Sequence, residues 1–246
     1  MTAAAAGLAF PDLPPGYELV VLRQREDAFR HACDVAPKAG AGTLVWIRRL
    51  DVLEFAVVLE PEEPLALARR VLFAGMNALA DAVGCACPPD KPIEFEWPGT
   101  LVFDRARLGG AQLGWPPGCG EEERPDWLVF GAMLLASKND LGDPGHTPDS
   151  TSLEDEDCEF SHEALIESFA RNLMRAFHVW SEQGFPQLAA DYLSRLSWPG
   201  GKVAATIAEN GDLVANRAGT EPERLALRPA LENAAWIDRA AGRPRL

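Results

Sequence analysis

The stretch Trp97-Pro-Gly-Thr-Leu-Val-Phe-Asp-Arg-Ala-Arg-Leu-Gly-Gly110 sets how the rest of the chain is interpreted. The apolar run Leu101–Phe103, a polar turn and a second apolar run predict two strands joined by a hairpin. Gly109 and Gly110 allow another group to approach the backbone closely. Arg107 stands just before them, and its guanidinium is a candidate anchor for a carboxylate or a phosphate. A solvent-facing arginine after a hairpin fits the same pattern, so both interpretations remain open.

Apolar runs before this stretch predict strands and helices. β-branched and aromatic runs predict strands, and the almost wholly apolar run at 53–59 predicts a central strand. Carboxylates and a proline at 61–64 predict the start of a long helix, because they suit the positive end of the helix dipole. The predicted elements are strands at 18–22, 43–47 and 53–59, a helix at 25–36 and a long helix from 61 to about 83, ended by Gly84.

The residues around and after the quoted stretch continue the pattern. Ser161 can cap a helix in which apolar residues recur at spacings of four and three. The long polar segment 137–157 predicts a functional or mobile loop. The predicted elements are strands at 93–97, 101–103, 108–115 and 127–136, and helices at 161–183 and 186–196.

The last fifty residues differ in character from the rest. Trp198-Pro-Gly-Gly201 indicates a boundary, and beyond it Glu209-Asn-Gly-Asp212 predicts a hairpin turn, because Asn-Gly readily takes positive φ. We therefore expect a helix-and-sheet domain over 1–197 and a small β-rich domain over 198–246. The C-terminal Arg243-Pro-Arg245 is expected to be a loose tail.

The composition narrows the classes of function. The chain has 246 residues, with 23 Lys and Arg against 37 Asp and Glu, so its formal charge is −14. This charge argues against free nucleic acid or an anionic membrane as a partner. Five cysteines without regular spacing argue against a disulfide framework and favour reduced thiols. The N-terminus lacks a signal-peptide pattern and no apolar run is long enough to span a membrane, which favours a cytoplasmic location.

No pattern in the sequence predicts a metal site. Cys85 and Cys87 are separated by one residue rather than the two of a zinc knuckle, and no second pair follows. The acidic run at 154–157 lacks the spaced order of a calcium loop. Nucleotide-binding glycine loops and nucleophile-elbow patterns are absent as well.

Several segments, taken in order, resemble the biotin and lipoate protein ligase family. The quoted stretch resembles the family motif Trp-Pro-Asn-Asp, a hairpin and then Lys-Leu-Gly-Gly. The segment 53–61 resembles the family's apolar strand before its long helix, and 127–133 its strand ending in Gly-Ile-Asn. Thr151-Ser-Leu153 and the segment 161–185 resemble its Thr-Ser-Leu, helix and Gly-Phe order. The residues after 198 stand where biotin ligases carry a small β domain.

The resemblance implies a fold and an activity. It implies an α+β fold, a mixed β-sheet packed with helices, plus a small β-rich C-terminal domain. It implies protein modification by a ligase or acyltransferase that attaches or transfers a biotinyl, lipoyl or related acyl group to a lysine of a carrier protein domain. Biotin, lipoate or an acyl-adenylate are the ligands it implies, with ATP in doubt. The implied site residues are Arg107 as the catalytic cation and Trp97, Gly109, Gly110, Arg48, Arg49 and Gly131 as substrate-binding residues.

Departures from the family pattern leave other functions open. The family's Asn-Asp pair falls on Gly99 and Thr100, its Asn of Gly-Ile-Asn falls on Leu135, and its glycine- and arginine-rich adenylate loop is missing before residue 53. A catalytically inactive relative that binds a small acid or a protein partner is therefore an alternative. A different enzyme on the same scaffold is a third possibility. It would use Glu94, Glu96 and Asp104, but the first two also fit a solvent-facing strand.

Overall fold

A seven-stranded mixed sheet forms the centre of the computed structural model, which describes residues 10–24, 26–139, 147–198, 203–217, 219 and 221–246. The strands lie in the order β1-β2-β3-β7-β6-β5-β4. Their bounds are β1 Glu18–Leu22, β2 Thr43–Ile47, β3 Val52–Leu59, β4 Ile93–Glu96, β5 Thr100–Phe103, β6 Ala106–Gly114 and β7 Leu128–Leu135. Only β1 and β2 pair in parallel.

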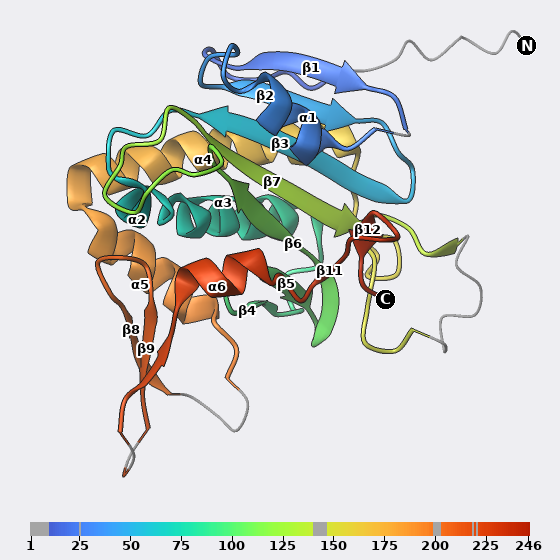
Figure 1. Ribbon diagram of the computed structural model, residues 1–246. Helices are drawn as coiled ribbons and strands as arrows, with labels where there is room; N and C mark the ends of the chain where they lie inside the picture. Colours follow the sequence, from blue (N-terminus) through green and yellow to red (C-terminus); the bar gives the residue numbers. More distant parts are fainter. Residues whose placement is uncertain (1–9, 25, 140–146, 199–202, 218, 220) are drawn as a thin grey trace, which may run out of the picture.

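The helices cover the two faces of this sheet unequally (Figure 1). α3 and α4 lie along one face, and the shorter α1 covers part of the other face. The helix bounds are α1 Ala28–Val35, α2 Leu65–Ala68, α3 Val71–Ala86, α4 His162–Gln183 and α5 Phe185–Arg195. Ser161 caps α4 as predicted, since its hydroxyl accepts from Ala164 N at 3.1 Å. The predicted α+β class, a mixed sheet packed with helices, is confirmed.

Side chains of the central strands alternate between these two faces. Phe55 and Phe130 point toward α4 and contact Phe169, with ring centroids 4.6 and 5.5 Å from it. Ala56 and Val129 point the opposite way and pack with α1. Both faces of β3 and β7 are thus covered, and the expectation of a central strand near 53–59 is confirmed.

The predicted long helix from 61 to 83 is two helices, α2 and α3. The break lies at Arg69 and Arg70, where the backbone tightens into bonds between residues three apart, such as Leu72 N to Arg69 O at 3.1 Å. Arg70 Nε also donates to Leu67 O at 2.9 Å and takes up a carbonyl that a continuous helix would use. Gly84 does not end the second helix, which continues to Ala86.

The described residues after 202 form a three-stranded sheet, a helix and a β-hairpin whose two strands have two residues each. The predicted hairpin is confirmed: Ala205 pairs with Ala215, and Gly211 turns with φ +85°. The element bounds are β8 Ala204–Ile207, β9 Leu213–Asn216, β10 Glu223–Leu225, α6 Leu227–Glu232, β11 Ile237–Asp238 and β12 Arg243–Pro244. Leu213 and Leu227 belong to the same apolar cluster as the α3 side chains. The domain boundary at 197 and 198 stays a prediction, and residues 199–202 beside it lie outside the described residues.

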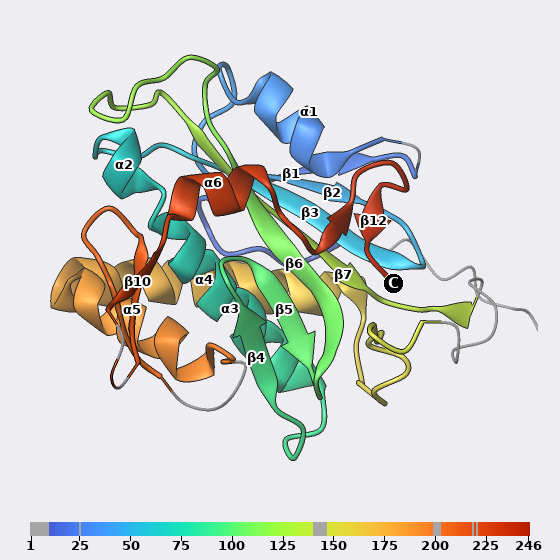
Figure 2. The same ribbon diagram turned by 60° about the horizontal axis from the view of Figure 1, so that its bottom comes forward.

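The prediction of a loose tail at 243–245 is wrong. Arg243 and Pro244 form β12, which pairs with β11, and Arg245 N donates to Trp236 O at 2.8 Å. Figure 2 shows this segment and α6 lying across the sheet on the side away from α3 and α4. An apolar pair at Trp236 and Ile237 holds the segment there, and the polar residues around it conceal this in the sequence.

One disulfide replaces the expected set of free thiols. Cys87, at the end of α3, is bonded to Cys158, which lies in the segment before α4. Cys33, Cys85 and Cys119 are free. The expectation of reduced thiols is therefore wrong for this pair, because the fold brings together two cysteines 71 residues apart in the sequence.

The long polar loop predicted at 137–157 is described only in part. Residues 140–146 of this loop lie outside the described residues. Its second half is bonded to the sheet through the backbone. Arg107 and Ser150 form an isolated parallel β-bridge, and Thr151 N donates to Arg107 O at 2.9 Å. In the described part of the chain, no helix is both long and apolar enough to cross a membrane.

Candidate functional site on the sheet face beneath the C-terminal segment

A bulge in β6 brings Arg107 and Gly110 to the same face of the sheet. Side chains three residues apart on a regular strand point to opposite faces. Here Arg107 pairs with Val102 and Gly110 with Thr100, and the register shifts between them. Gly110 also pairs with Met133 of β7, whose side chain lies on the face away from α3 and α4. Arg107 therefore shares this face with apolar side chains of β7.

The Arg107 guanidinium makes one hydrogen bond to the C-terminal segment. Its Nη1 donates to Arg245 O at 3.4 Å. Its Nε is buried and has no hydrogen-bond partner within the described part of the chain. A buried N–H without an acceptor is costly. The guanidinium thus keeps part of its fork available for a planar acceptor such as a carboxylate.

Arg49 approaches the same end of the sheet from the β2–β3 connection. Its Nε and Nη2 pair with the Asp51 carboxylate at 3.1 and 2.8 Å, and its Nη1 donates to Gly242 O at 3.1 Å. This bidentate pair lowers the pKa of Asp51 and raises that of Arg49. Arg49 and Arg107 therefore both donate to backbone carbonyls of the C-terminal segment.

Arg48 is not brought to this face. Its guanidinium lies over the rings of Trp46 and Phe10, at 4.8 and 4.6 Å from their centroids. Trp46 belongs to the core on the α3 and α4 side. The two neighbouring arginines thus point to different sides of the sheet, as residues next to each other at a strand end do.

The three glycines predicted as substrate-binding residues differ in what an added Cβ would meet. A Cβ on Gly110 would collide with the Gly99 carbonyl and lie 2.6 Å from the Trp236 ring, and one on Gly131 would lie 2.5 Å from Phe29 of α1. A Cβ on Gly109 would collide with the Met133 carbonyl of the adjacent strand. Gly109 and Gly110 therefore both allow a neighbouring backbone to approach, and Gly110 and Gly131 also make room for side chains that lie on the sheet face.

Trp97 lies on the opposite side of the sheet. Its ring packs with Phe73 of α3 and Tyr192 of α5, at centroid distances of 5.9 and 6.3 Å. Tyr192, fully buried beside it, donates to Pro98 O at 2.8 Å. The predicted role of Trp97 as a substrate-binding residue beside Arg107 does not fit this placement, because the indole belongs to the core on the helix side.

Glu54 is a buried carboxylate on the Arg107 face that the sequence reasoning missed. It is 2 % exposed, accepts from Ala28 N at 2.7 Å and lies 3.5 Å from Arg49 Nη1. Burial is the main cause that raises the pKa of Glu54 to about 7. A charged residue inside the apolar run 53–59 was the signal available in the sequence.

Replacement of Glu54 tests whether the pKa of this carboxylate is raised in the folded protein. Its pKa is raised from 4.5 to about 7, so folding favours its protonated form. Stability from this group is complete below about pH 4.5 and is lost as the pH rises through 7, a loss of about 3 kcal/mol. Glu54→Gln should therefore unfold in urea with a smaller decline in stability between pH 5 and 8 than the wild type. His162 is common to both proteins, so its titration cancels. Equal pH slopes would contradict the raised pKa.

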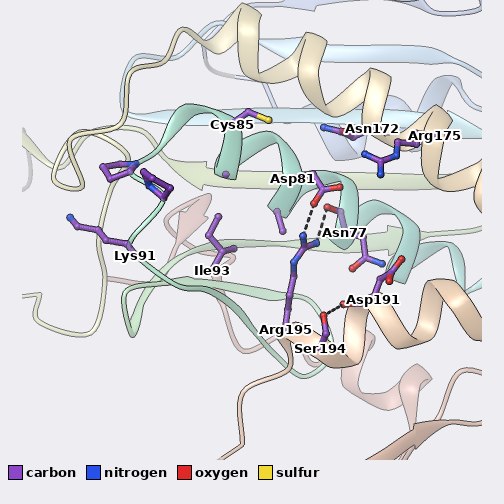
Figure 3. A pocket seen from close by; sticks show the side chains of 14 residues that line it. Asn77, Asp81, Cys85, Lys91, Ile93, Asn172, Arg175, Asp191, Ser194 and Arg195 are labelled. Atoms are coloured by element: carbon purple, nitrogen blue, oxygen red, sulfur yellow. Dashed lines mark hydrogen bonds and ion pairs between the residues drawn. The ribbon is translucent and has the colours of Figure 1, made fainter.

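A cavity of about 700 Å³ lies on the helix side between α3, α4 and α5 (Figure 3). Arg195 crosses it to Asp81 at 2.6 Å. Asn77 donates to Leu188 O at 3.1 Å, while its Oδ1 is buried with no partner in the described ranges. An asparagine in the apolar sequence of α3 was the available signal. None of the residues predicted for the site lines this cavity.

The alternative acid–base residues do not form a cluster in a cavity. Glu96 is exposed and Glu94 is half-buried on β4, at one edge of the sheet, and Asp104 is exposed in the following hairpin. Among the residues that the structure describes, no group of three His, Cys, Asp or Glu side chains could hold a metal ion.

Comparison with known proteins identifies the family of this chain. The model of the biotin/lipoate A/B protein ligase family matches residues 13–194. The chain belongs to this family. Within this family, a biotin–[acetyl-CoA-carboxylase] ligase of Paracoccus denitrificans is 27% identical over 166 residues, which is 65% of this chain and 67% of that protein.

Solved structures of the family have the same fold. A biotin protein ligase-like protein of unknown function from Silicibacter sp. TM1040 is 27% identical, with a TM-score of 0.77 over 89% of this chain and 98% of that one. The biotin protein ligase of Aquifex aeolicus is 14% identical, with a TM-score of 0.66 over 85% and 95%. The second likeness concerns the fold alone.

Proposed function

We propose that this family member binds an activated acyl group of the biotin or lipoate class, an acyl-phosphate or a thioester, beside Arg107 and transfers the acyl group to a lysine of a carrier protein domain. The observation that carries the proposal is the buried Nε of Arg107, which lacks a partner in the described part of the chain. Nε and Nη together form a fork from which a carboxylate or a phosphate can accept two parallel hydrogen bonds. Arg107 also stands where the family resemblance places its catalytic lysine.

The acyl donor in this proposal is an activated acyl group rather than the free acid and ATP. β2 ends at Ile47 and β3 begins at Val52, so four residues stand where the family carries its adenylate loop. So short a connection does not fit a loop that closes over a nucleotide. In the transfer, the carrier lysine attacks the acyl carbonyl and an amide bond forms. The bond between the acyl carbon and the donor's sulfur or phosphate oxygen breaks, and its electron pair leaves with that atom. The amine proton passes to water.

A cytoplasmic location is part of the same proposal and rests on the family and on the sequence expectations. The Cys87–Cys158 bond is the one described feature that does not favour a reducing compartment.

A second candidate is a relative that binds a small acid or a protein partner without catalysis. The observation that favours it is the use of Arg49, which is shared between Asp51 and the C-terminal segment. In this case the one cation beside Gly110 suffices for binding, and Arg49, already paired in the described structure, does not stabilise the charge of a transfer step.

Arg107→Ala distinguishes the two candidates. The wild type is incubated with lipoyl, octanoyl or biotinyl donors and with a carrier domain, and acylation is followed by mass spectrometry. The proposal expects wild-type acylation and a loss of about ten- to hundredfold in Arg107→Ala, the worth of a charge-assisted bond.

Arg105→Ala is the matched control, because it removes the same charge from the exposed turn of the same hairpin. It should leave acylation unchanged. Binding of an acid by the wild type, lost in Arg107→Ala and without acylation of any carrier, would decide for the second candidate.

A further inference from the structure

The face that Arg107 shares with β7 carries an apolar patch, which we define as Val52, Met133 and Leu135. Val52 pairs with Leu135 at the ends of β3 and β7, and the three side chains lie opposite the α3 and α4 layer. Arg49 and Arg107 approach the same end of the sheet from β2 and β6. An apolar surface with two guanidinium groups at its border suits a ligand that has an acyl chain and an anionic head.

The C-terminal segment, residues 234–246, meets each of these groups in turn. Trp236 and Ile237 pack on the apolar patch, and the Trp236 ring fills the space over Gly110. Trp236 is 2 % exposed, and its Nε1 donates to Ala111 O at 3.1 Å. The carbonyls of residues 242 and 245 accept from Arg49 and Arg107, at 3.1 and 3.4 Å.

The attachment of this segment to the sheet depends on side chains. β11 and β12 pair only with each other and form a separate two-stranded sheet, so no ladder of backbone bonds joins them to β6 or β7. The two arginines donate to neutral carbonyls. Bonds from the same guanidinium groups to a carboxylate or a phosphate are shorter and about twice as strong. An anion can therefore replace both carbonyls with a gain in electrostatic energy.

We propose that residues 234–246 occupy the acyl site of this protein, and that an acyl ligand binds the Val52, Met133 and Leu135 patch only when this segment leaves. The acyl chain replaces Trp236 and Ile237, and the anionic head replaces the two carbonyls on Arg49 and Arg107. The inference rests on the proposed function, because it takes the acid-binding site to lie beside Arg107. The population of the released segment then sets the apparent affinity for the ligand.

The test uses the full chain and non-hydrolysable acyl-adenylate analogues of biotin, lipoate and octanoate, together with the free acids. Calorimetry gives the dissociation constants for the wild type and for Trp236→Ala. We expect Trp236→Ala to bind at least one of these probes ten or more times more tightly, since the bound segment no longer competes. Trp236→Phe keeps a ring over Gly110 but loses the bond to Ala111 O, so its affinity should lie between those of the wild type and Trp236→Ala.

Arg239→Ala is the matched control within the segment, because Arg239 is exposed. It should bind like the wild type. Hydrogen exchange provides a readout that needs no variant. When the probe binds, the amide of Arg245, which donates to Trp236 O, should exchange faster in the wild type.

The outcomes separate this inference from the proposed function. Equal affinity of the wild type and Trp236→Ala, with the Arg245 amide still protected, would overturn the role of the segment and leave the proposed function standing. Tighter binding by Trp236→Ala without acylation of a carrier would support the segment's role and exclude the transfer step. No binding of any probe to any variant would overturn both.

Discussion

Cys158→Ser is expected to lower the free energy of unfolding by about 4 kcal/mol under non-reducing conditions, by the chain-entropy relation for loops of this length. The Cys87–Cys158 bond closes a loop across 71 positions of sequence, so it removes many conformations from the unfolded chain. It also ties the end of α3 to the segment whose Asp149 O and Thr151 N bond to the Arg107 backbone. Urea denaturation followed by circular dichroism measures the change.

Cys85→Ser is the control for this prediction, because Cys85 is free and exposed two residues from Cys87. It should leave the urea midpoint unchanged. A reducing agent should bring the wild type to the stability of Cys158→Ser and should not affect that variant. Identical wild-type curves with and without the reducing agent would contradict the bond.

The second large effect is expected for Gly109→Ala, a loss of about 3 kcal/mol or more. The added Cβ would collide with the Met133 carbonyl, a backbone atom of the neighbouring strand. Relief requires β6 and β7 to separate at the centre of the sheet, where both faces are buried. A flexible side chain could move aside at little cost, but two paired backbones cannot.

Gly40→Ala serves as the comparison, because nothing lies within 4 Å of its added Cβ and its φ is ordinary. Thermal denaturation of both variants gives the two changes. Gly40→Ala should fall within a few tenths of a kcal/mol of the wild type. A Gly109→Ala protein as stable as Gly40→Ala would mean that the strands are less closely apposed than described.

The parts of the fold that the sequence predicts well are those set by local pattern. The strands at 18–22 and 43–47 agree with β1 and β2, because apolar and β-branched residues bounded by turns determine a strand locally. The start of α4 follows from the Ser161 cap in the same way. At the division of the helix, the Arg69 guanidinium pairs with Glu121, far along the chain, and local pattern cannot predict such a contact.

The site is less predictable because its arrangement depends on register. The bulge beside Val102 places Arg107 and Gly110 on one face, whereas regular alternation would separate them. The same alternation could not show that Trp97 faces the helices, or that Trp236 lies over Gly110 from more than a hundred residues away. Glu54 carried a readable signal, as a charge inside an apolar strand, and so did Asn77 in the apolar sequence of α3.

α6 has attachments of its own, separate from those of the segment after it, and this has a quantitative consequence for the proposed release of that segment. Asp212 accepts from the first amide of α6, Leu227 N, at 2.9 Å, and Glu121 holds Arg228 of the same helix. The C-terminal segment is thus tethered only a few residues from its own docking surface. A short tether of this kind gives an effective concentration in the millimolar range, roughly. Ligand at micromolar concentration therefore competes with an internal rival about a thousand times more concentrated, and the protein responds to the acid only if the acid is bound correspondingly more tightly than the segment.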